Sequence, residues 1–247
     1  MNPVLFNIGP LEIRYYGILF ALAILVSYFI IIKIAKEKNI PRSIIEELII
    51  YITISIVIGA RLFEVLFYSP SYYFNNPIKI FHIWEGGLAS HGAILLAIIT
   101  LYIYTKKKKL NFYEIADILI IPAALGAAFI RIGNFINSEL VGKITSVPWA
   151  VKFDNYEGLR HPVQIYQAIT NTITFFILYP LRNKALKPGT IFWLFLLLFS
   201  IFRFITEFFK DLPLDYGLHL YGLDLAQYIS IILIPVSAIF LYRLYYK

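Results

Sequence analysis

A polar stretch, Arg131 to Glu139, directly follows the uncharged apolar run Ile118 to Ile130. If the predicted helix continues, four polar residues share one face: Arg131, Asn134, Ser138 and Glu139. An arginine near hydrocarbon is costly and persists mainly where it has a partner or a polar ligand. The stretch is therefore interpreted as the headgroup-binding edge of an intramembrane site. The alternative is an interfacial anchor whose arginine reaches water.

A second charged pair, Arg203 and Glu207, lies within a mostly aromatic and aliphatic run. At this spacing the two side chains share a helix face and can form an ion pair. The alternative is a pair that only makes the helix insertable, but apolar residues would usually serve stability as well, which favours a function. Two arginines near one membrane face suit a phosphate, because guanidinium groups bind its oxygens bidentately and stabilise charge on a departing phosphate. Beside Arg131, Gly133 would let another backbone approach closely.

His91 stands in the sequence Ser90-His-Gly, within a predicted membrane helix. Such a histidine is either a core residue that donates to a carbonyl or a proton acceptor near neutral pH, and its position alone does not separate the two. No metal-binding pattern links it to His82, His161 or His219, so neither a metal site nor a cofactor is predicted.

The composition is that of a membrane protein. Of the 247 residues 60% are hydrophobic and 15% charged, against about 25% charged in soluble domains. We expect one all-α, polytopic domain over residues 1–247. The absence of cysteine excludes disulfides, a thiolate nucleophile and a self-attached lipid. The net charge of +7 is carried mostly by loops and indicates membrane orientation and anionic lipid rather than nucleic acid.

Uncharged runs separated by polar segments predict about seven membrane-spanning helices. Between them we expect an irregular segment over 64–87, a small excursion with a short strand over Val147 to Phe153, and a loop over 211–221. The predicted helices are Tyr15–Ile32, Leu48–Ala60 with its flanks, Gly86–Thr105, about Tyr113–Arg131, His161–Leu181, the run that begins after Pro188-Gly189 and ends at about Lys210, and about Leu225–Tyr242.

Basic residues gather in alternate loops, and the side that carries them is predicted to be cytoplasmic. The N-terminus and the excursion after the fourth predicted helix then face outward, and the C-terminus faces the cytoplasm. The thirteen basic residues are Lys33, Lys36, Lys38, Arg42, Lys106, Lys107, Lys108, Lys109, Arg182, Lys184, Lys187, Arg243 and Lys247.

Seven segments of the chain resemble segments of the prolipoprotein diacylglyceryl transferase family, and they occur in the same order along the chain. The match is specific because it runs along most of the chain, with the longest similarity at Arg131-Ile-Gly-Asn-Phe-Ile-Asn-Ser-Glu-Leu-Val-Gly142. The other segments are Gly9-Pro10 to Tyr16-Gly17, Gly59 to Tyr68, Trp84 to Gly92, Arg160 to Tyr166, Arg203 to Phe209, and Gln227 to Ser230.

The resemblance implies an enzyme of bacterial lipoprotein maturation in the cell inner (cytoplasmic) membrane, acting as a monomer. Members move a diacylglyceryl group from phosphatidylglycerol to the lipobox cysteine of a prolipoprotein, which forms a thioether and releases glycerol phosphate. Because the nucleophile belongs to the substrate, a chain without cysteine fits this reaction. A phospholipid transporter or flippase, or a receptor-like seven-helix protein, could bind a headgroup with the same arginines.

The resemblance also implies site residues. His91 matches the histidine often proposed as base, and Arg131 and Arg203 match essential arginines expected to hold the phosphate. Phe199 stands where many relatives have tyrosine, so one hydroxyl is missing. The remaining matched positions are Tyr16, Asn134, Glu139, Gly142 and Glu207, with Gln164 and Tyr166 in an outward segment.

Overall fold

The computed structural model describes residues 3–9, 11–211 and 222–246. The chain divides into two compact units, Met1–Ile34 with Asp117–Lys247, and Ala35–Ala116. The long helices are α1 (Tyr15–Glu37), α2 (Arg42–Phe63), α4 (Ser90–Lys108), α5 (Phe112–Ile136), α6 (Val163–Leu181), α7 (Thr190–Glu207) and α8 (Leu225–Tyr246). The short elements are β1 (Val4–Ile8), β2 (Leu11–Arg14), the π-helix η1 (Glu64–Tyr68), α3 (Pro70–Asn75), the 3-10 helices η2 (Pro77–Phe81) and η3 (Ile83–Glu85), β3 (Val151–Lys152) and β4 (Leu159–Arg160).

All seven predicted helices are present, and five of them are long and apolar enough to cross a membrane: α1, α2 with its continuation to Tyr68, α5, α7 and α8. The other two, α4 and α6, have 19 residues each. α4 ends in three lysines, and α6 carries glutamine and asparagine side chains, so both are less hydrophobic. The protein is therefore a multi-pass membrane protein with five clear candidate spans, and the count of seven stays a prediction.

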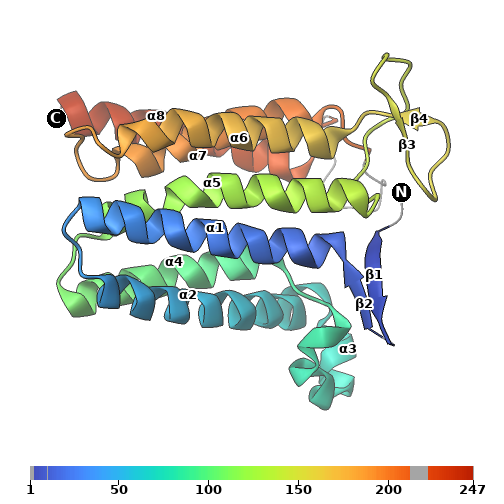
Figure 1. Ribbon diagram of the computed structural model, residues 1–247, viewed down its shortest axis with the longest axis horizontal. Helices are drawn as coiled ribbons and strands as arrows, with labels where there is room; N and C mark the ends of the chain where they lie inside the picture. Colours follow the sequence, from blue (N-terminus) through green and yellow to red (C-terminus); the bar gives the residue numbers. More distant parts are fainter. Residues whose placement is uncertain (1–2, 10, 212–221, 247) are drawn as a thin grey trace. The chain divides into compact units, whose positions relative to one another are not determined.

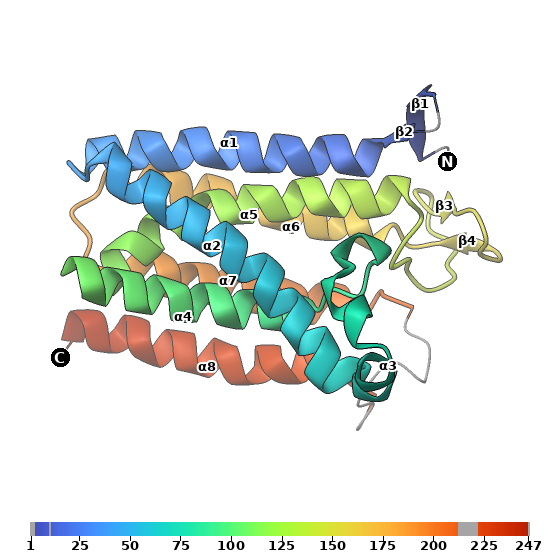
Figure 2. The ribbon, with the colours of Figure 1, turned by 90° about the horizontal axis from the view of Figure 1, so that it is seen from below.

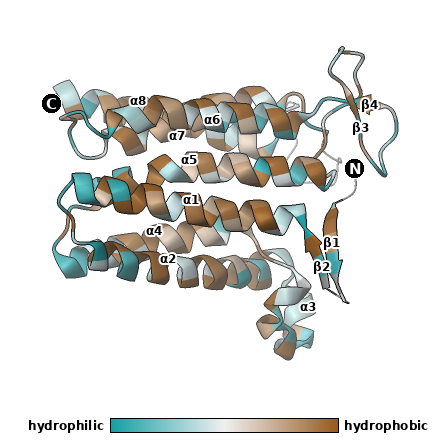
Figure 3. Ribbon diagram, viewed as in Figure 1, coloured by the Kyte–Doolittle hydropathy of each residue, from teal (hydrophilic) through white to brown (hydrophobic). Residues whose placement is uncertain are grey.

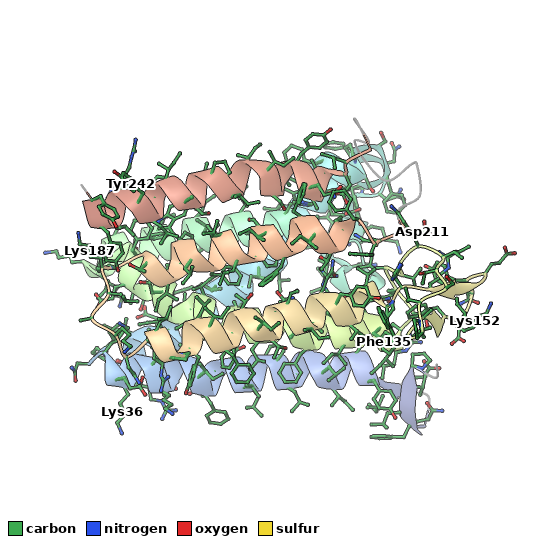
Figure 4. All side chains as sticks on the ribbon, turned by 90° about the horizontal axis from the view of Figure 1, so that it is seen from above. Lys36, Phe135, Lys152, Lys187, Asp211 and Tyr242 are labelled. Carbon is green, nitrogen blue, oxygen red and sulfur yellow. The ribbon has the colours of Figure 1, made fainter. Side chains whose placement is uncertain are left out.

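In the first unit α1, α5, α6, α7 and α8 run side by side, with hydrophobic residues along most of their length (Figures 1 and 3). Lys187 and Tyr242 lie at one end of these helices, and Lys152 and Asp211 lie at the other (Figure 4). A buried carboxylate fixes the start of α7, because Asp117 accepts hydrogen bonds from the backbone N–H groups of Gly189 (2.8 Å) and Phe192 (2.7 Å).

In the second unit α2 and α4 cross at two glycines (Figure 2). A Cβ atom at Gly59 would lie 2.4 Å from the Gly92 carbonyl oxygen, and one at Gly92 would lie 2.1 Å from the Gly59 oxygen. The Ala89 N–H donates to the Ala60 carbonyl at 3.0 Å beside this crossing. The contact therefore requires glycine on both helices, since any side chain would push the backbones apart.

Three predictions need correction. The fold is mostly helical but not all-α: β1 and β2 form an antiparallel hairpin before α1, and β3 and β4 form a second two-stranded sheet. Only Val151–Lys152 of the strand predicted over Val147 to Phe153 is extended. The segment 64–87 is not irregular, because it contains η1, α3, η2 and η3. The predicted loop over 211–221 lies, apart from Asp211, outside the described residues.

Candidate functional site

The candidate site begins at the end of α5. The prediction that Arg131, Asn134, Ser138 and Glu139 share one helix face required the helix to reach Glu139, but it ends earlier. α5 ends at Ile136, and Ser138 (φ 56°) and Leu140 (φ 54°) adopt the left-handed conformation. The predicted helical alignment of Ser138 and Glu139 with Arg131 is therefore wrong. The turn nevertheless brings Glu139 back to the helix: its Oε2 accepts from Asn134 Nδ2 at 2.9 Å, and its N–H donates to the Asn134 carbonyl at 2.9 Å.

The missing side chain at Gly133 allows an aromatic ring to approach the helix closely. The sequence had suggested the close approach of another backbone instead. A Cβ atom there would lie 2.7 Å from Cδ2 of Tyr16, so the Tyr16 ring packs directly on the α5 backbone. The Tyr16 phenol interacts electrostatically with Glu139 and Arg131. The contact joins the start of α1 to the end of α5 and places three of the predicted site residues together.

Arg203 on α7 forms the predicted ion pair with Glu207, with 2.9 Å between Nε and Oε2. The second carboxylate oxygen of Glu207 accepts from Lys210 Nζ at 2.8 Å, and the Glu207 side chain is almost fully buried. Both oxygens of this carboxylate thus already face a cation. Lys210 was missed from the sequence, although residues 203, 207 and 210 follow a helical spacing.

Arg131 lies within electrostatic reach of Arg203, Glu207 and Tyr16. In the part of the chain that the structure describes, no carboxylate oxygen lies within ion-pair distance of Arg131. Its side-chain hydrogen bond to Asn134 Oδ1 is long, 3.5 Å. Among the described residues this mostly buried guanidinium, beside a second arginine, thus has no carboxylate in ion-pair contact, and an anionic ligand would complete such an arrangement.

Asp224 at the start of α8 adds a further carboxyl group to this cluster. It caps the helix by accepting from the Gln227 N–H at 2.7 Å, and its own N–H donates to Gln227 Oε1 at 3.0 Å. Burial, followed by a hydrogen bond to Glu207, raises the pKa of Asp224 and favours its neutral form. Burial also lowers the pKa of Lys210, against the opposite effect of Glu207.

Gly142 lies in the excursion between α5 and α6, at a close approach of two backbones. Its N–H donates to the His161 carbonyl at 3.1 Å, and its carbonyl accepts from Arg160 Nη1 at 3.1 Å. Arg160 is buried and forms an ion pair with Asp211, just beyond α7. The excursion is thereby fixed to the end of α7 that carries Glu207 and Lys210.

We predict that Gly142→Ala destabilises the protein, because it distorts this contact between the two backbones. An added Cβ would lie 2.3 Å from the His161 carbonyl oxygen and 2.6 Å from its Cβ, so the backbone must move. The expected result is a clearly lower melting temperature in detergent, corresponding to roughly 1–3 kcal/mol for an overpacked position. Gly17→Ala is the matched control, because a Cβ at Gly17 meets nothing within 4 Å. Equal melting temperatures for the two variants would contradict the prediction.

The two predicted residues of α6 have structural contacts near this excursion. Gln164 Nε2 donates to the Glu139 carbonyl at 2.6 Å, which supports the turn after α5. The Tyr166 hydroxyl accepts from Trp149 Nε1 at 2.7 Å and lies 3.0 Å from His161 Nδ1. Both residues therefore hold the excursion and the end of α5 in place.

His91 belongs to the second unit and is described there by itself. It is exposed at the start of α4, where its Nδ1 lies 3.2 Å from the Tyr68 hydroxyl and its ring lies beside Phe63. The nine other predicted site residues belong to the first unit. Among these, the structure brings together Tyr16, Arg131, Asn134, Glu139, Arg203 and Glu207.

Fold and site thus define a multi-pass membrane protein with an arginine-rich cluster at one end of its helices. The sequence model of the prolipoprotein diacylglyceryl transferase family matches residues 3–243, and the chain belongs to this family. Three similar proteins are named phosphatidylglycerol--prolipoprotein diacylglyceryl transferase. That of Tolumonas auensis is 41% identical over 85% of this chain and 83% of its own length. The protein of Janthinobacterium sp. is 37% identical over 100% of this chain and 96% of its own length. The protein of Geobacter sulfurreducens is 35% identical over 93% of this chain and 90% of its own length.

Proposed function

We propose that this protein transfers the diacylglyceryl group of phosphatidylglycerol to the cysteine thiol of a prolipoprotein lipobox. The sulfur, after losing its proton, attacks the glyceryl carbon that carries the phosphate. A carbon–sulfur bond forms, the carbon–oxygen bond to the phosphate breaks, and its electron pair leaves with glycerol phosphate. The family membership and the shared name of the relatives support this reaction, the first step of bacterial lipoprotein maturation.

The observation that carries the proposal is Arg131, which lies beside Arg203 and has no carboxylate within ion-pair distance among the described residues. A phosphodiester bears one negative charge, whereas the departing phosphate monoester bears about two near neutral pH. Negative charge therefore grows on the phosphate as the bond breaks. Two guanidinium groups that are already fixed beside it would stabilise the transition state more than the bound lipid, which is what lowers the barrier.

Lys210 gives the cluster a third cation. Its ammonium and Arg203 share the Glu207 carboxylate, and both lie within electrostatic reach of Arg131. Burial, followed by a hydrogen bond to Glu207, raises the pKa of Asp224, the second carboxyl group beside Lys210. The three cations Arg131, Arg203 and Lys210 suit a leaving group that becomes a dianion.

We predict that Lys210→Met slows transfer by roughly tenfold, the loss expected when one charge interaction of about 1.4 kcal/mol disappears. Lys210→Arg should retain most of the activity, because it keeps the charge beside Glu207. The measurement is the initial rate of lipid transfer to a lipobox peptide, with melting temperatures taken in parallel. Lys143→Met, which removes an exposed lysine of the excursion between α5 and α6, serves as the control. Equal rates for Lys210→Met and Lys143→Met would remove Lys210 from the site.

His91 is assigned the role of general base for the substrate thiol, on the strength of its match to the family's histidine. Tyr16, Asn134 and Glu139 would hold the lipid headgroup beside the arginines, and Glu207 would orient Arg203. Gly142, Gln164 and Tyr166 would act by fixing the excursion. All these residues come from one chain, so the protein is proposed to act as one membrane domain and as a monomer.

The proposed location is the bacterial inner membrane, with the N-terminus outside and the C-terminus in the cytoplasm. Lys187 lies at the opposite end of the first unit from Lys152 and Asp211, which supports an outward site if the basic loops face the cytoplasm (Figure 4). We predict that a tag inserted at 106–109 is accessible only after the cells are permeabilised. Labelling of this tag in intact spheroplasts would contradict both the orientation and the outward site.

The test of function is mass spectrometry of a synthetic lipobox peptide after incubation with purified protein and phosphatidylglycerol. We expect the peptide to gain one diacylglyceryl group per cysteine, with release of an equal amount of glycerol phosphate. A peptide with serine in place of cysteine should stay unmodified. Movement of lipid between leaflets without its consumption would contradict the transferase assignment.

A further inference from the structure

The start of α4 is held in place by three consecutive residues of α2. Gly59 packs on the backbone of Gly92, and the Ala60 carbonyl accepts a hydrogen bond from the Ala89 N–H at 3.0 Å. The third residue, Arg61, donates to the carbonyls of the glycine pair that precedes this helix. The N-cap residue of α4 forms no capping hydrogen bond with its own side chain. The start of the helix therefore depends on these contacts with α2.

Arg61 is a buried cation whose donors are directed at backbone oxygens. At 5% exposure, it donates to the Tyr73 hydroxyl at 2.9 Å, and its guanidinium lies 4.8 Å from the centre of the Tyr73 ring. Among the described residues, no carboxylate oxygen lies within ion-pair distance of Arg61. It also donates to five backbone carbonyls, those of Lys79, Ile80, His82, Gly86 and Gly87.

This arrangement specifies one conformation for the segment 79–87. Burying a charge costs free energy unless the group is fully hydrogen-bonded. A guanidinium carries five N–H donors in a fixed plane, so the carbonyls that satisfy it must converge from defined directions. The backbone that leads into α4 and the Arg61 side chain therefore fix each other.

The last two residues that bond to Arg61 form the turn into α4. Gly86 and Gly87 have φ angles of 90° and 70°, in the region that favours glycine. In this conformation their carbonyl oxygens lie 2.6 and 2.9 Å from Arg61 Nη1. A Cβ atom at Gly87 would lie 2.9 Å from the same nitrogen and 2.6 Å from the Tyr73 hydroxyl. The turn therefore has no room for a side chain and keeps its glycines against the guanidinium.

His91, the second residue of α4, lies within the stretch 86–92 that α2 holds at both ends. Its Nδ1 lies 3.2 Å from the Tyr68 hydroxyl, and its ring centre lies 6.2 Å from that of Phe63. Both partners belong to the same continuous apolar helix, which runs from Arg42 to Tyr68. The direction of the imidazole therefore follows from how the turn at 86–87 is seated on this helix.

We propose that Arg61 is a positioning residue for lipid transfer, which fixes the turn at 86–87 and thereby sets the orientation of the His91 imidazole. The inference rests on the proposed function, in which His91 is the general base. A base must lie within hydrogen-bond reach of the proton that it removes, and a misplacement of about 1 Å can slow a reaction roughly 100-fold. Arg61 is buried against the segment 79–87, so it acts through His91 rather than on the substrate.

Arg61→Lys keeps the charge, but an ammonium cannot reproduce the planar set of donors. We expect this variant to transfer lipid to a lipobox peptide about 10- to 100-fold more slowly at pH 7. The rate should recover as the pH is raised toward 9, where the thiol ionises without a base. In the His91→Gln background, the same substitution should cost less than about threefold, because both changes act through one group. Arg42→Lys, at an exposed ion pair with Glu46, is the control and should alter neither rate.

Equal slowing by Arg61→Lys in both backgrounds, without recovery at high pH, would overturn the proposal and leave Arg61 as a residue for stability alone. If Arg61→Lys does not fold, Tyr73→Phe replaces it, because this variant removes only the hydroxyl that bonds to Arg61 Nη1. We expect a smaller loss of rate, with the same recovery at high pH and the same dependence on His91.

A second measurement needs no lipid transfer. Diethyl pyrocarbonate modifies histidines, and mass spectrometry reads each site separately. In Arg61→Lys we expect faster modification of His91, whose Nδ1 loses its fixed place beside Tyr68, and an unchanged rate at His161 in the first unit. Unchanged reactivity of His91 in the folded variant would overturn the proposal. Wild-type protein that transfers no lipid, or full activity of His91→Gln, would instead contradict the proposed function, and the reactivity of His91 distinguishes these cases.

Discussion

Transfer should fall about as far in Arg131→Lys and Arg203→Lys as in the corresponding alanine variants. Lysine retains the charge, but its ammonium is a point donor and cannot hold two phosphate oxygens with a planar fork. If each arginine contributes about 3 kcal/mol to the transition state, each substitution should slow transfer by roughly two orders of magnitude. The measurement is the initial rate with a lipobox peptide at saturating phosphatidylglycerol.

The two arginines should differ in their effect on folding. Arg203 occupies one oxygen of the buried Glu207, so Arg203→Ala leaves that carboxylate with Lys210 alone and should lower the melting temperature. Arg131 has no carboxylate partner among the described residues, so Arg131→Ala should lose activity with little loss of stability. Arg14→Lys is the control, since the side chain of this arginine is exposed and forms its ion pair with the exposed Glu12. Near-normal transfer by both lysine variants would end the bidentate hypothesis.

The helices of this protein could be predicted because their signal is local. Uncharged runs bounded by basic residues located every long helix, including α5 around Arg131 and α7 around Arg203. The end of α5 could not be located in this way. Ser138 and Leu140 take positive φ without being glycine, a conformation that depends on the Asn134–Glu139 and Gln164–Glu139 contacts. Helix propensity alone does not locate this end, because tertiary contacts fix the turn.

The contacts missed from the sequence join residues that are distant in the chain or that follow a helix end. Lys210 comes just after the last residue of α7, and although its spacing from Arg203 and Glu207 is helical, nothing in the sequence showed that its ammonium would share the Glu207 carboxylate. Arg61 donates hydrogen bonds to backbone carbonyls about twenty residues away in the chain. A pattern of side-chain types does not indicate which backbone carbonyls need a donor. The sequence motifs therefore indicated the ligand, whereas the electrostatic balance around that ligand needed the structure.

His91→Gln separates a chemical role of this residue from a packing role. If His91 is the base, the variant should bind phosphatidylglycerol normally and transfer it about 10²- to 10⁴-fold more slowly at pH 7. The substrate thiol has a pKa of about 8.5, so its thiolate fraction rises nearly tenfold per pH unit below that value. Raising the pH from 7 toward 9 should therefore rescue the variant, because hydroxide then removes the proton that the imidazole would have taken. The wild-type rate should change much less over the same range.

Tyr68→Phe is the companion variant, since it removes the hydroxyl 3.2 Å from His91 Nδ1 and keeps the imidazole. We expect it to slow transfer by less than about tenfold, through a less well oriented ring, and to keep the wild-type pH profile. If His91 only packs the start of α4, His91→Gln should instead lower the melting temperature and show no rescue with pH. A flat pH response of His91→Gln, measured with intact lipid binding, would end the assignment of His91 as the base and leave the arginine cluster to act on a thiolate formed in solution.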